Sequence, residues 1–208
     1  MTVAPDRPLR ADAARNADRI LRAAREVYAT VGPDAPIEAV ASHAGVGERT
    51  LYRRFPSKGE LIRAALDLSI AENLAPAIEL ARQREDPLQG FTDLVNAATS
   101  LGAQEHNLLA AARKAGVLAD ISTSLDAALQ ELMERAQEAR LIRADLVADD
   151  LPRIIAMLNS VLWTMDPADR GWRRYVSLVL DGLTNTKGRR LMPAPKLQYI
   201  APEGDWPM

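Results

Sequence analysis

Apolar residues recur along most of this 208-residue chain at steps of three and four, which is the spacing of one face of an α-helix. No stretch shows the strict alternation of apolar and polar residues that a half-buried strand requires. Ala, Leu and Arg dominate the composition, and all three favour helices. The pattern therefore predicts an all-α protein with about nine helices.

The N-terminal part of the pattern predicts three helices in close succession. The first covers about residues 12–31 and stops at Gly32, which proline follows, because glycine suits a helix C-terminus and proline cannot continue the helix. Two short helices follow, over about residues 37–44 and 48–55. Gly45 lies between them and can adopt the left-handed conformation that a tight turn needs.

The two short helices have the spacing of a DNA-binding helix-turn-helix. Leu51 and Phe55 are four residues apart, so they would anchor the inner face of the second short helix. Its outer face could then enter a DNA major groove, which is about 12 Å wide and admits one helix. The residues expected to face outward or to lie at the exposed N-terminal end are Glu48, Arg49, Thr50, Tyr52 and Arg53. In the alternative interpretation the two helices belong to an ordinary bundle, and their arginines form only a solvated patch.

The rest of the chain predicts a larger helical region. Ser57 and Glu60 form a capping box, and the helix that they begin should run to about Gln83, with Pro76 able to kink it. Further helices are predicted over about residues 87–102, 104–115, 119–139, 149–165 and 171–183.

These elements predict three parts of the chain. Residues 1–60 form a three-helix domain that contains the helix-turn-helix, and residues 61–186 form a larger helical domain. Residues 187–208 hold four prolines and should be an extended tail.

Charge and composition narrow the class of protein. The net charge is −2, but residues 1–63 hold 11 Lys and Arg against 8 Asp and Glu, whereas the rest holds 15 against 20. This modest basic excess supports a nucleic-acid contact in the N-terminal domain. The N-terminus has charges of both signs and lacks the apolar run of a secretory signal, and residues 154–165 are too short to span a bilayer. We therefore expect a cytoplasmic protein with no membrane partner.

Catalytic and metal-binding patterns are missing from the sequence. There is no cysteine, and the two histidines, His43 and His106, fall in no metal-ligand motif. No phosphate-binding glycine loop, dinucleotide fingerprint or nucleophile elbow occurs. Glu131, Glu134 and Glu138 share one helix stripe and are interpreted as a solvated face. We expect no enzyme activity, no cofactor and no metal.

Residues 37–61 resemble the DNA-binding domain of the TetR family of transcriptional regulators. The resemblance rests on Gly45-Val46, on Thr50-Leu51-Tyr52 and on residues 55–58, Phe-Pro-Ser-Lys, and it extends over roughly residues 15–65. Two positions differ from the family. Gly47 stands where serine is common, which removes a side-chain cap at a cost of a few tenths of a kcal/mol. Arg54 stands where histidine is common and keeps a positive charge.

The resemblance implies roles for individual residues on DNA. Residues that match Glu48, Arg49, Thr50 and Tyr52 lie in or beside the major groove. Those that match Tyr52, Arg53, Arg54 and Lys58 often contact phosphates. Arg7, Arg10 and Arg15 could reach the minor groove or the flanking phosphates.

The resemblance also implies a ligand-responsive repressor that binds double-stranded DNA as a homodimer, with residues 149–183 forming the dimer interface and residues 61–186 the ligand-binding domain. A small-molecule effector would release the protein from a palindromic operator. Large adaptable side chains and one histidine are the candidates for the effector pocket: Phe91, His106, Met133, Met157 and Trp163. The alternatives are a small helical ligand carrier or enzyme without DNA binding, and a constitutive adaptor with a vestigial helix-turn-helix.

Overall fold

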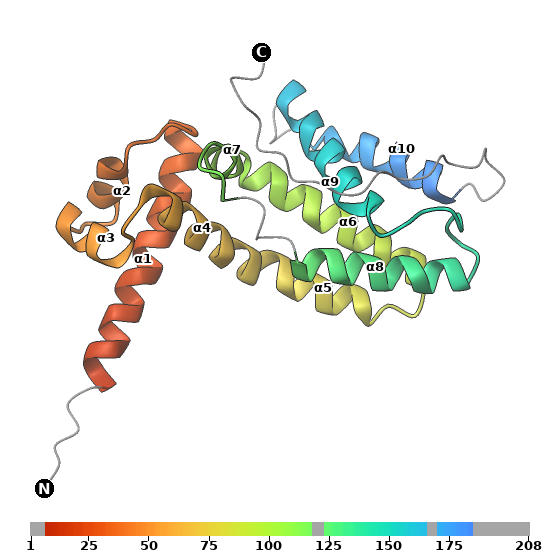
Figure 1. The fold of residues 1–208 in the computed structure, drawn as a ribbon, viewed down its shortest axis with the longest axis horizontal. Helices are drawn as coiled ribbons and strands as arrows, with labels where there is room; N and C mark the ends of the chain where they lie inside the picture. Colours follow the sequence, from red (N-terminus) through yellow and green to blue (C-terminus); the bar gives the residue numbers. More distant parts are fainter. Residues whose placement is uncertain (1–6, 118–122, 166–169, 185–208) are drawn as a thin grey trace, which may run out of the picture. The chain divides into compact units, whose positions relative to one another are not determined.

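The computed structural model describes residues 7–117, 123–165 and 170–184, and all regular structure in these ranges is helical (Figure 1). The prediction of an all-α fold is confirmed. The described ranges hold ten α-helices, because the helix predicted to run from Ser57 to Gln83 is divided by a π-helical turn. The predicted tail, residues 187–208, lies outside the described residues.

The described residues fall into two compact units. The N-terminal unit holds residues up to 68 together with 107–117, and the C-terminal unit holds the rest. The helices of the N-terminal unit are α1 (Arg7–Val31), α2 (Ile37–His43), α3 (Glu48–Arg54), α4 (Lys58–Ser69) and α7 (His106–Lys114). The last residue of α4, Ser69, and the first residue of α7, His106, belong to the C-terminal unit.

The core of the N-terminal unit forms around α1. Ile20, Ala24 and Tyr28 follow one another at four-residue steps on one face of α1 and are fully buried. Gly32 ends the helix with φ 105°, and its N–H donates to the carbonyl of Tyr28 at 3.0 Å. A residue with a side chain is strained at that φ, which explains the glycine that follows α1.

Helix α7 packs into the N-terminal unit although it lies far along the chain. Its Leu108, Ala111 and Ala112 are buried. The Asn107 side-chain amide donates to the carbonyl of Ala29 in α1 at 3.3 Å. α7 therefore adds a fifth helix to a unit in which the sequence predicted three.

In the C-terminal unit, α6 (Pro87–Gln104) is central. It packs against α5 (Ala75–Arg82), α8 (Thr123–Glu138), α9 (Asp150–Val161) and α10 (Trp172–Thr184), as Figure 1 shows. Asp86 caps its N-terminus by accepting from the backbone N–H of Leu88 at 2.9 Å. Phe91, Leu94 and Val95 of α6 are buried in the core of this unit, which Leu129 and Leu132 of α8 also enter. A short 3₁₀ turn, η2 (Leu162–Thr164), extends α9.

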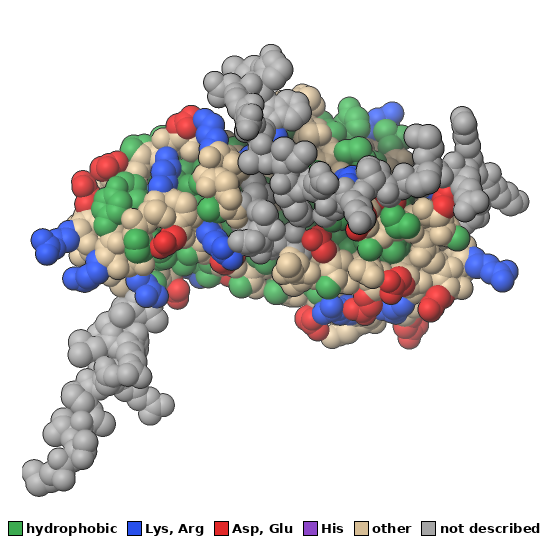
Figure 2. All heavy atoms as spheres, in the orientation of Figure 1, with side chains coloured by type: hydrophobic (Ala, Val, Ile, Leu, Met, Phe, Trp, Pro, Cys, Tyr) green, Lys and Arg blue, Asp and Glu red, His purple; other side chains and the backbone are tan. Residues whose placement is uncertain are grey.

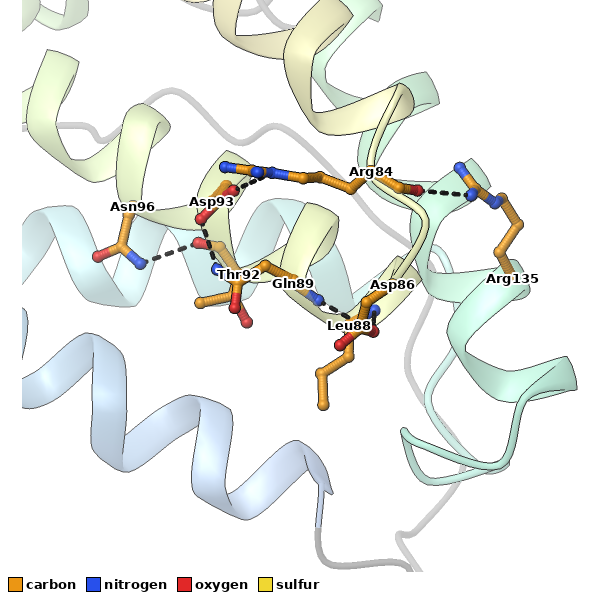
Figure 3. Close-up of polar contacts among 8 residues, drawn as sticks. All are labelled: Arg84, Asp86, Leu88, Gln89, Thr92, Asp93, Asn96 and Arg135. Carbon is orange, nitrogen blue, oxygen red and sulfur yellow. Dashed lines mark hydrogen bonds and ion pairs between the residues drawn. The ribbon is translucent and has the colours of Figure 1, made fainter.

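The corner between α5 and α6 is held by polar contacts (Figure 3). The Arg135 guanidinium of α8 donates to the carbonyl of Arg84 at 3.1 Å, as Figure 3 shows. It also donates to the carbonyl of Arg82 at 3.1 Å, and so satisfies acceptors at the C-terminal end of α5. Arg84 in turn pairs with Asp93 of α6 at 2.9 Å. These contacts join α5, α6 and α8 at one end of the unit.

Candidate nucleic-acid interface

The turn between α2 and α3 is fixed by backbone hydrogen bonds. Gly45 has φ 63°, a left-handed conformation that glycine adopts without strain. The N–H of Val46 donates to the carbonyl of Ala41 at 3.0 Å, and that of Gly45 donates to Ser42 at 3.1 Å. This is the hydrogen-bond pattern of a helix closed by a left-handed residue, and it directs the chain back into α3.

Helix α3 is anchored by the two residues that the sequence predicted. Leu51 is 0% exposed and Phe55 is 7% exposed. The Phe55 N–H donates to the carbonyl of Leu51 at 2.8 Å, so Phe55 closes the last turn of α3. One side of this seven-residue helix is therefore held by the unit's core.

The opposite side of α3 is open to solvent. Tyr52 is 42% exposed although it is aromatic. Thr50 is partly buried, and the remaining predicted DNA contacts are exposed: Glu48, Arg49, Arg53, Arg54 and Lys58. Figure 2 shows Lys and Arg side chains at the surface of the region where Figure 1 draws α2 and α3. The structure thus brings all seven predicted DNA-contact residues to α3 and the start of α4.

The N-terminal ends of α3 and α4 differ in their caps. Gly47 begins α3 without a side-chain cap, and the N–H groups of Thr50 and Leu51 donate to its carbonyl at 2.9 and 3.1 Å. In α4 the N–H of Glu60 donates to the Ser57 hydroxyl at 3.1 Å, which is half of the predicted capping box. Lys58 lies in this first turn, where the helix N-terminus favours an anion.

Tyr28 lies beneath Lys58 in the same unit. The Lys58 Nζ is 5.8 Å from the centre of the Tyr28 ring, within reach of a cation–π interaction. Burial, with a smaller contribution from the negative charge of Asp34, raises the pKa of Tyr28 to about 12. The Tyr28 hydroxyl therefore stays neutral, and its oxygen has no hydrogen-bond partner in the described structure.

Three further arginines of the N-terminal unit were predicted to contact DNA. The side chains of Arg7 and Arg10 lie outside the described residues. Arg15 is exposed on α1. Their predicted contact with DNA stays a prediction.

The five candidates for an effector pocket do not form one group. Phe91 and Met133 are buried in the core of the C-terminal unit. His106 and Trp163 are in contact, with ring centres 3.9 Å apart and planes tilted by 52°, and burial lowers the pKa of His106. Met157 is exposed on α9. The predicted pocket stays a prediction, and the His106–Trp163 contact is its best-defined part.

Two family matches cover most of the chain. Residues 20–65 match the family described as bacterial regulatory proteins, tetR family. Residues 86–185 match the C-terminal domain of SbtR-like transcriptional regulators. A TetR transcriptional regulator from Streptomyces coelicolor is 30% identical over 81% of this chain and 98% of its own, with a TM-score of 0.57. The chain belongs to the TetR family.

Two further solved structures extend the comparison. A TetR transcription regulatory protein from Mycobacterium vanbaalenii is 28% identical over 85% of this chain and 99% of its own, with a TM-score of 0.56. The regulator FadR from Bacillus subtilis, in complex with stearoyl-CoA, is 18% identical over 81% of this chain and 97% of its own, and its TM-score of 0.65 shows a shared fold. No curated protein sequence matches the chain.

Family membership makes this TetR-family protein a DNA-binding transcriptional regulator, as the resemblance in residues 37–61 implied. Within the described ranges, no helix is long and apolar enough to cross a membrane. No group of three metal-ligating side chains occurs in that same part of the chain.

Sequence reasoning missed the contacts of α7. Lys114, at its end, forms an ion pair with Asp34 in the turn after α1, and Asn107, near its start, bonds to α1 itself. The partners in each pair are about 80 residues apart in the chain, so no local pattern could join them.

Proposed function

We propose that this protein is a repressor that binds a palindromic operator as a homodimer and leaves it when a small molecule binds. The observation that carries the proposal is the two-sided character of α3, with Leu51 and Phe55 buried and Arg49, Tyr52 and Arg53 open to solvent. A helix held in this way can enter a major groove without losing its support.

The exposed residues suit different parts of a DNA site. Glu48, Arg49, Thr50 and Tyr52 would lie in or beside the major groove. Arg49 can donate two hydrogen bonds to one guanine edge, which reads sequence. Arg53, Arg54 and Lys58, with the Tyr52 hydroxyl, would contact phosphates, which position the protein but read no sequence. The site would therefore combine one arginine that reads a base pair with several groups that position the protein on the DNA backbone.

A homodimer would place two copies of α3 on one operator. The proposed interface lies on α9, η2 and α10, within residues 149–183. These elements expose large apolar side chains that a monomer would leave in water: Met157, Tyr175 and Leu178. Apolar surface of this kind marks an interaction site, and a two-fold contact between copies of the same elements would cover it.

Effector binding would act on the C-terminal unit. The stearoyl-CoA complex of FadR, which shares the fold, supports a small-molecule ligand. His106 and Trp163 are the proposed contact point, because their rings meet and both are partly accessible. The ligand releases DNA only if it binds better to a dimer whose two α3 helices are wrongly spaced, and operator DNA must then weaken ligand binding by the same factor.

Helix α7 offers a route for this coupling. It begins at His106, and from Asn107 on it belongs to the N-terminal unit. Asn107 binds the Ala29 carbonyl of α1, and Lys114 binds Asp34. A displacement of His106 would therefore be passed along one short helix to α1 and to the turn that precedes α2.

The proposal is tested by selecting bound DNA from a random pool with the full-length protein. We expect an inverted repeat whose half-site centres lie about 34 Å apart, or a multiple of that distance. Light scattering on the same sample should give the mass of a dimer. A pool without a consensus would overturn specific DNA binding, and a monomer mass at every concentration would overturn the dimer.

A further inference from the structure

The Lys58 side chain lies over a buried aromatic ring. Its Nζ is 5.8 Å from the centre of the Tyr28 ring. Lys58 is exposed at the start of α4, whereas Tyr28, in α1, is 0% exposed. Both residues belong to the N-terminal unit. An ammonium group at this distance is attracted by the π electrons of the ring, so the ring favours one place for a side chain that is otherwise flexible.

The hydroxyl of Tyr28 is not needed for this contact. Its oxygen is buried and has no hydrogen-bond partner in the described structure, a condition that costs free energy. Burial raises the pKa of Tyr28, with a smaller contribution from Asp34, so the hydroxyl stays uncharged. A phenylalanine at this position would offer Lys58 the same ring without the unsatisfied oxygen. Any effect of Tyr28 on Lys58 therefore comes from the ring.

Asp34 is a carboxylate that could capture the Lys58 ammonium, but Lys114 already occupies it. The Lys114 Nζ lies 2.9 Å from one Asp34 carboxylate oxygen and 3.1 Å from the other. The hydrogen bond from Lys114 is the largest cause of the lowered pKa of Asp34, and the charge of Lys58 contributes less. Lys58 is thus close enough for its charge to act on Asp34, while Lys114 holds the carboxylate. The Lys58 ammonium is left to the Tyr28 ring.

The backbone that carries Lys58 is held by its neighbours. The N–H groups of Glu60 and Leu61 donate to the Ser57 hydroxyl and carbonyl, at 3.1 Å each. A Cβ on Gly59 would lie 3.5 Å from the Val117 side chain, so the first turn of α4 lies against the end of the α7 segment. With the backbone fixed, only the side-chain torsions of Lys58 decide where its ammonium lies. A group that restricts these torsions before DNA binds reduces the entropy lost on binding.

We propose that Tyr28 is a positioning residue for DNA binding, whose ring holds the Lys58 ammonium at the start of α4 in the place where it contacts an operator phosphate. Tyr28 is buried in α1 and does not itself contact DNA. Because phosphates are the same at every base pair, the effect of Tyr28 is on affinity for all DNA sequences and not on base preference. This inference rests on the proposed function, since it requires that Lys58 binds a phosphate.

The test compares two replacements of Tyr28 in the full-length protein, titrated with the selected operator and with an unrelated duplex. Tyr28→Phe keeps the ring and should leave both affinities unchanged. Tyr28→Leu keeps an apolar side chain but has no ring, and should weaken binding to both duplexes by about two- to fivefold. Ile20→Ala is the matched control, because it removes buried volume from the same face of α1, two turns from Tyr28, and should leave the affinity of the folded protein unchanged. Equal losses in Tyr28→Phe and Tyr28→Leu, or no loss in Tyr28→Leu, would overturn the role of the ring.

A double-mutant cycle with Lys58→Met separates positioning from a general loosening of the unit. Lys58→Met removes the charge and should reduce the slope of log affinity against log salt by about one. In that background Tyr28→Leu should cause no further loss of affinity, whereas an equal loss in both backgrounds would overturn the proposal.

A measurement without DNA distinguishes this proposal from the proposed function. The ring current of Tyr28 should shift the NMR signals of the Lys58 methylene protons beside the ammonium, in wild type and in Tyr28→Phe but not in Tyr28→Leu. The same shifts in all three proteins would overturn the contact. Failure of the wild-type protein to bind any DNA would instead overturn the proposed function, and the NMR comparison would still decide whether the ring holds Lys58.

Discussion

Lys114 holds Asp34 through both carboxylate oxygens, with Nζ 2.9 Å from Oδ1 and 3.1 Å from Oδ2. The pair joins the last turn of α7 to the segment between α1 and α2. Both side chains are exposed, so water screens the pair and its contribution to stability is small. Its importance is positional, since it ties α7 to the segment that leads into the helix-turn-helix.

The first prediction concerns the titration of Asp34. The hydrogen bond from Lys114 lowers the pKa of Asp34, and the charges of Lys114 and Lys58 lower it further. Lys114→Met should therefore raise the Asp34 pKa toward its ordinary value, as measured by NMR titration of the carboxyl carbon. A depressed folded-state pKa contributes stability above the unfolded pKa, and this is lost as the pH falls through the folded value. Wild type and variant should thus converge in acid, and an unchanged Asp34 pKa in the variant would show that the ion pair is absent in solution.

A second prediction separates the two sides of α3. Leu51→Ala creates a cavity in the core of the N-terminal unit and should lower the free energy of unfolding by about 2–5 kcal/mol. Tyr52→Ala, one residue away on the exposed side, should change it by about 0.5 kcal/mol or less while weakening DNA binding. Urea unfolding and operator titration measure the two effects. The opposite ranking of the two stabilities would mean that α3 is rotated from the orientation described.

The close approach of α5 and α6 gives a third prediction. A Cβ on Gly90 would lie 2.5 Å from the backbone carbonyl oxygen of Ala81, which cannot swing aside as a side chain can. Gly90→Ala should therefore destabilise the protein by about 1–3 kcal/mol. Gly59→Ala in α4 is the matched control, because the atom nearest to its added Cβ lies at 3.5 Å, an ordinary van der Waals contact, and it should stabilise the helix by about 0.5–1 kcal/mol. Equal melting temperatures for the two variants would contradict the packing described here.

Arg140 gives a fourth prediction. Its φ is 59°, and among the described residues every other positive φ belongs to a glycine. Arg140 closes the C-terminus of α8. The N–H of Leu141 donates to the Ala136 carbonyl at 2.9 Å, as in a Schellman motif. Arg140→Gly should raise the free energy of unfolding by about 1 kcal/mol, since glycine adopts this conformation without strain. Arg140→Ala keeps the strain and serves as the control, and a Gly variant no more stable than the Ala variant would refute the left-handed cap.

Local patterns predicted the helix-turn-helix well because its determinants are close in sequence. Leu51 and Phe55 share one helix face, Gly45 takes a left-handed turn, and the Ser57 cap forms as expected. Pro76 indicated an irregular helix, but a proline does not specify whether a helix bends or gains a residue.

The features that the sequence did not predict depend on distant residues or on context. The contact of Lys114 with Asp34 joins positions 80 residues apart. Arg140 adopts a left-handed conformation, which an arginine in a sequence does not predict. A sequence pattern does not distinguish large apolar residues that fill a core from those that line a pocket. Phe91 and Met133 are both buried in the core.

A comparison of Arg49→Ala with Arg53→Ala decides whether α3 reads DNA with its exposed face. Each variant is titrated with the selected operator and with substituted operators over a range of salt concentrations. Arg53→Ala should weaken binding to every sequence alike and reduce the slope of log affinity against log salt by about one. Arg49→Ala should weaken binding by about 1–3 kcal/mol and relax the preference at one base pair of each half-site. Equal losses on all sequences for both variants, or no loss for either, would show that the exposed face of α3 does not read DNA sequence.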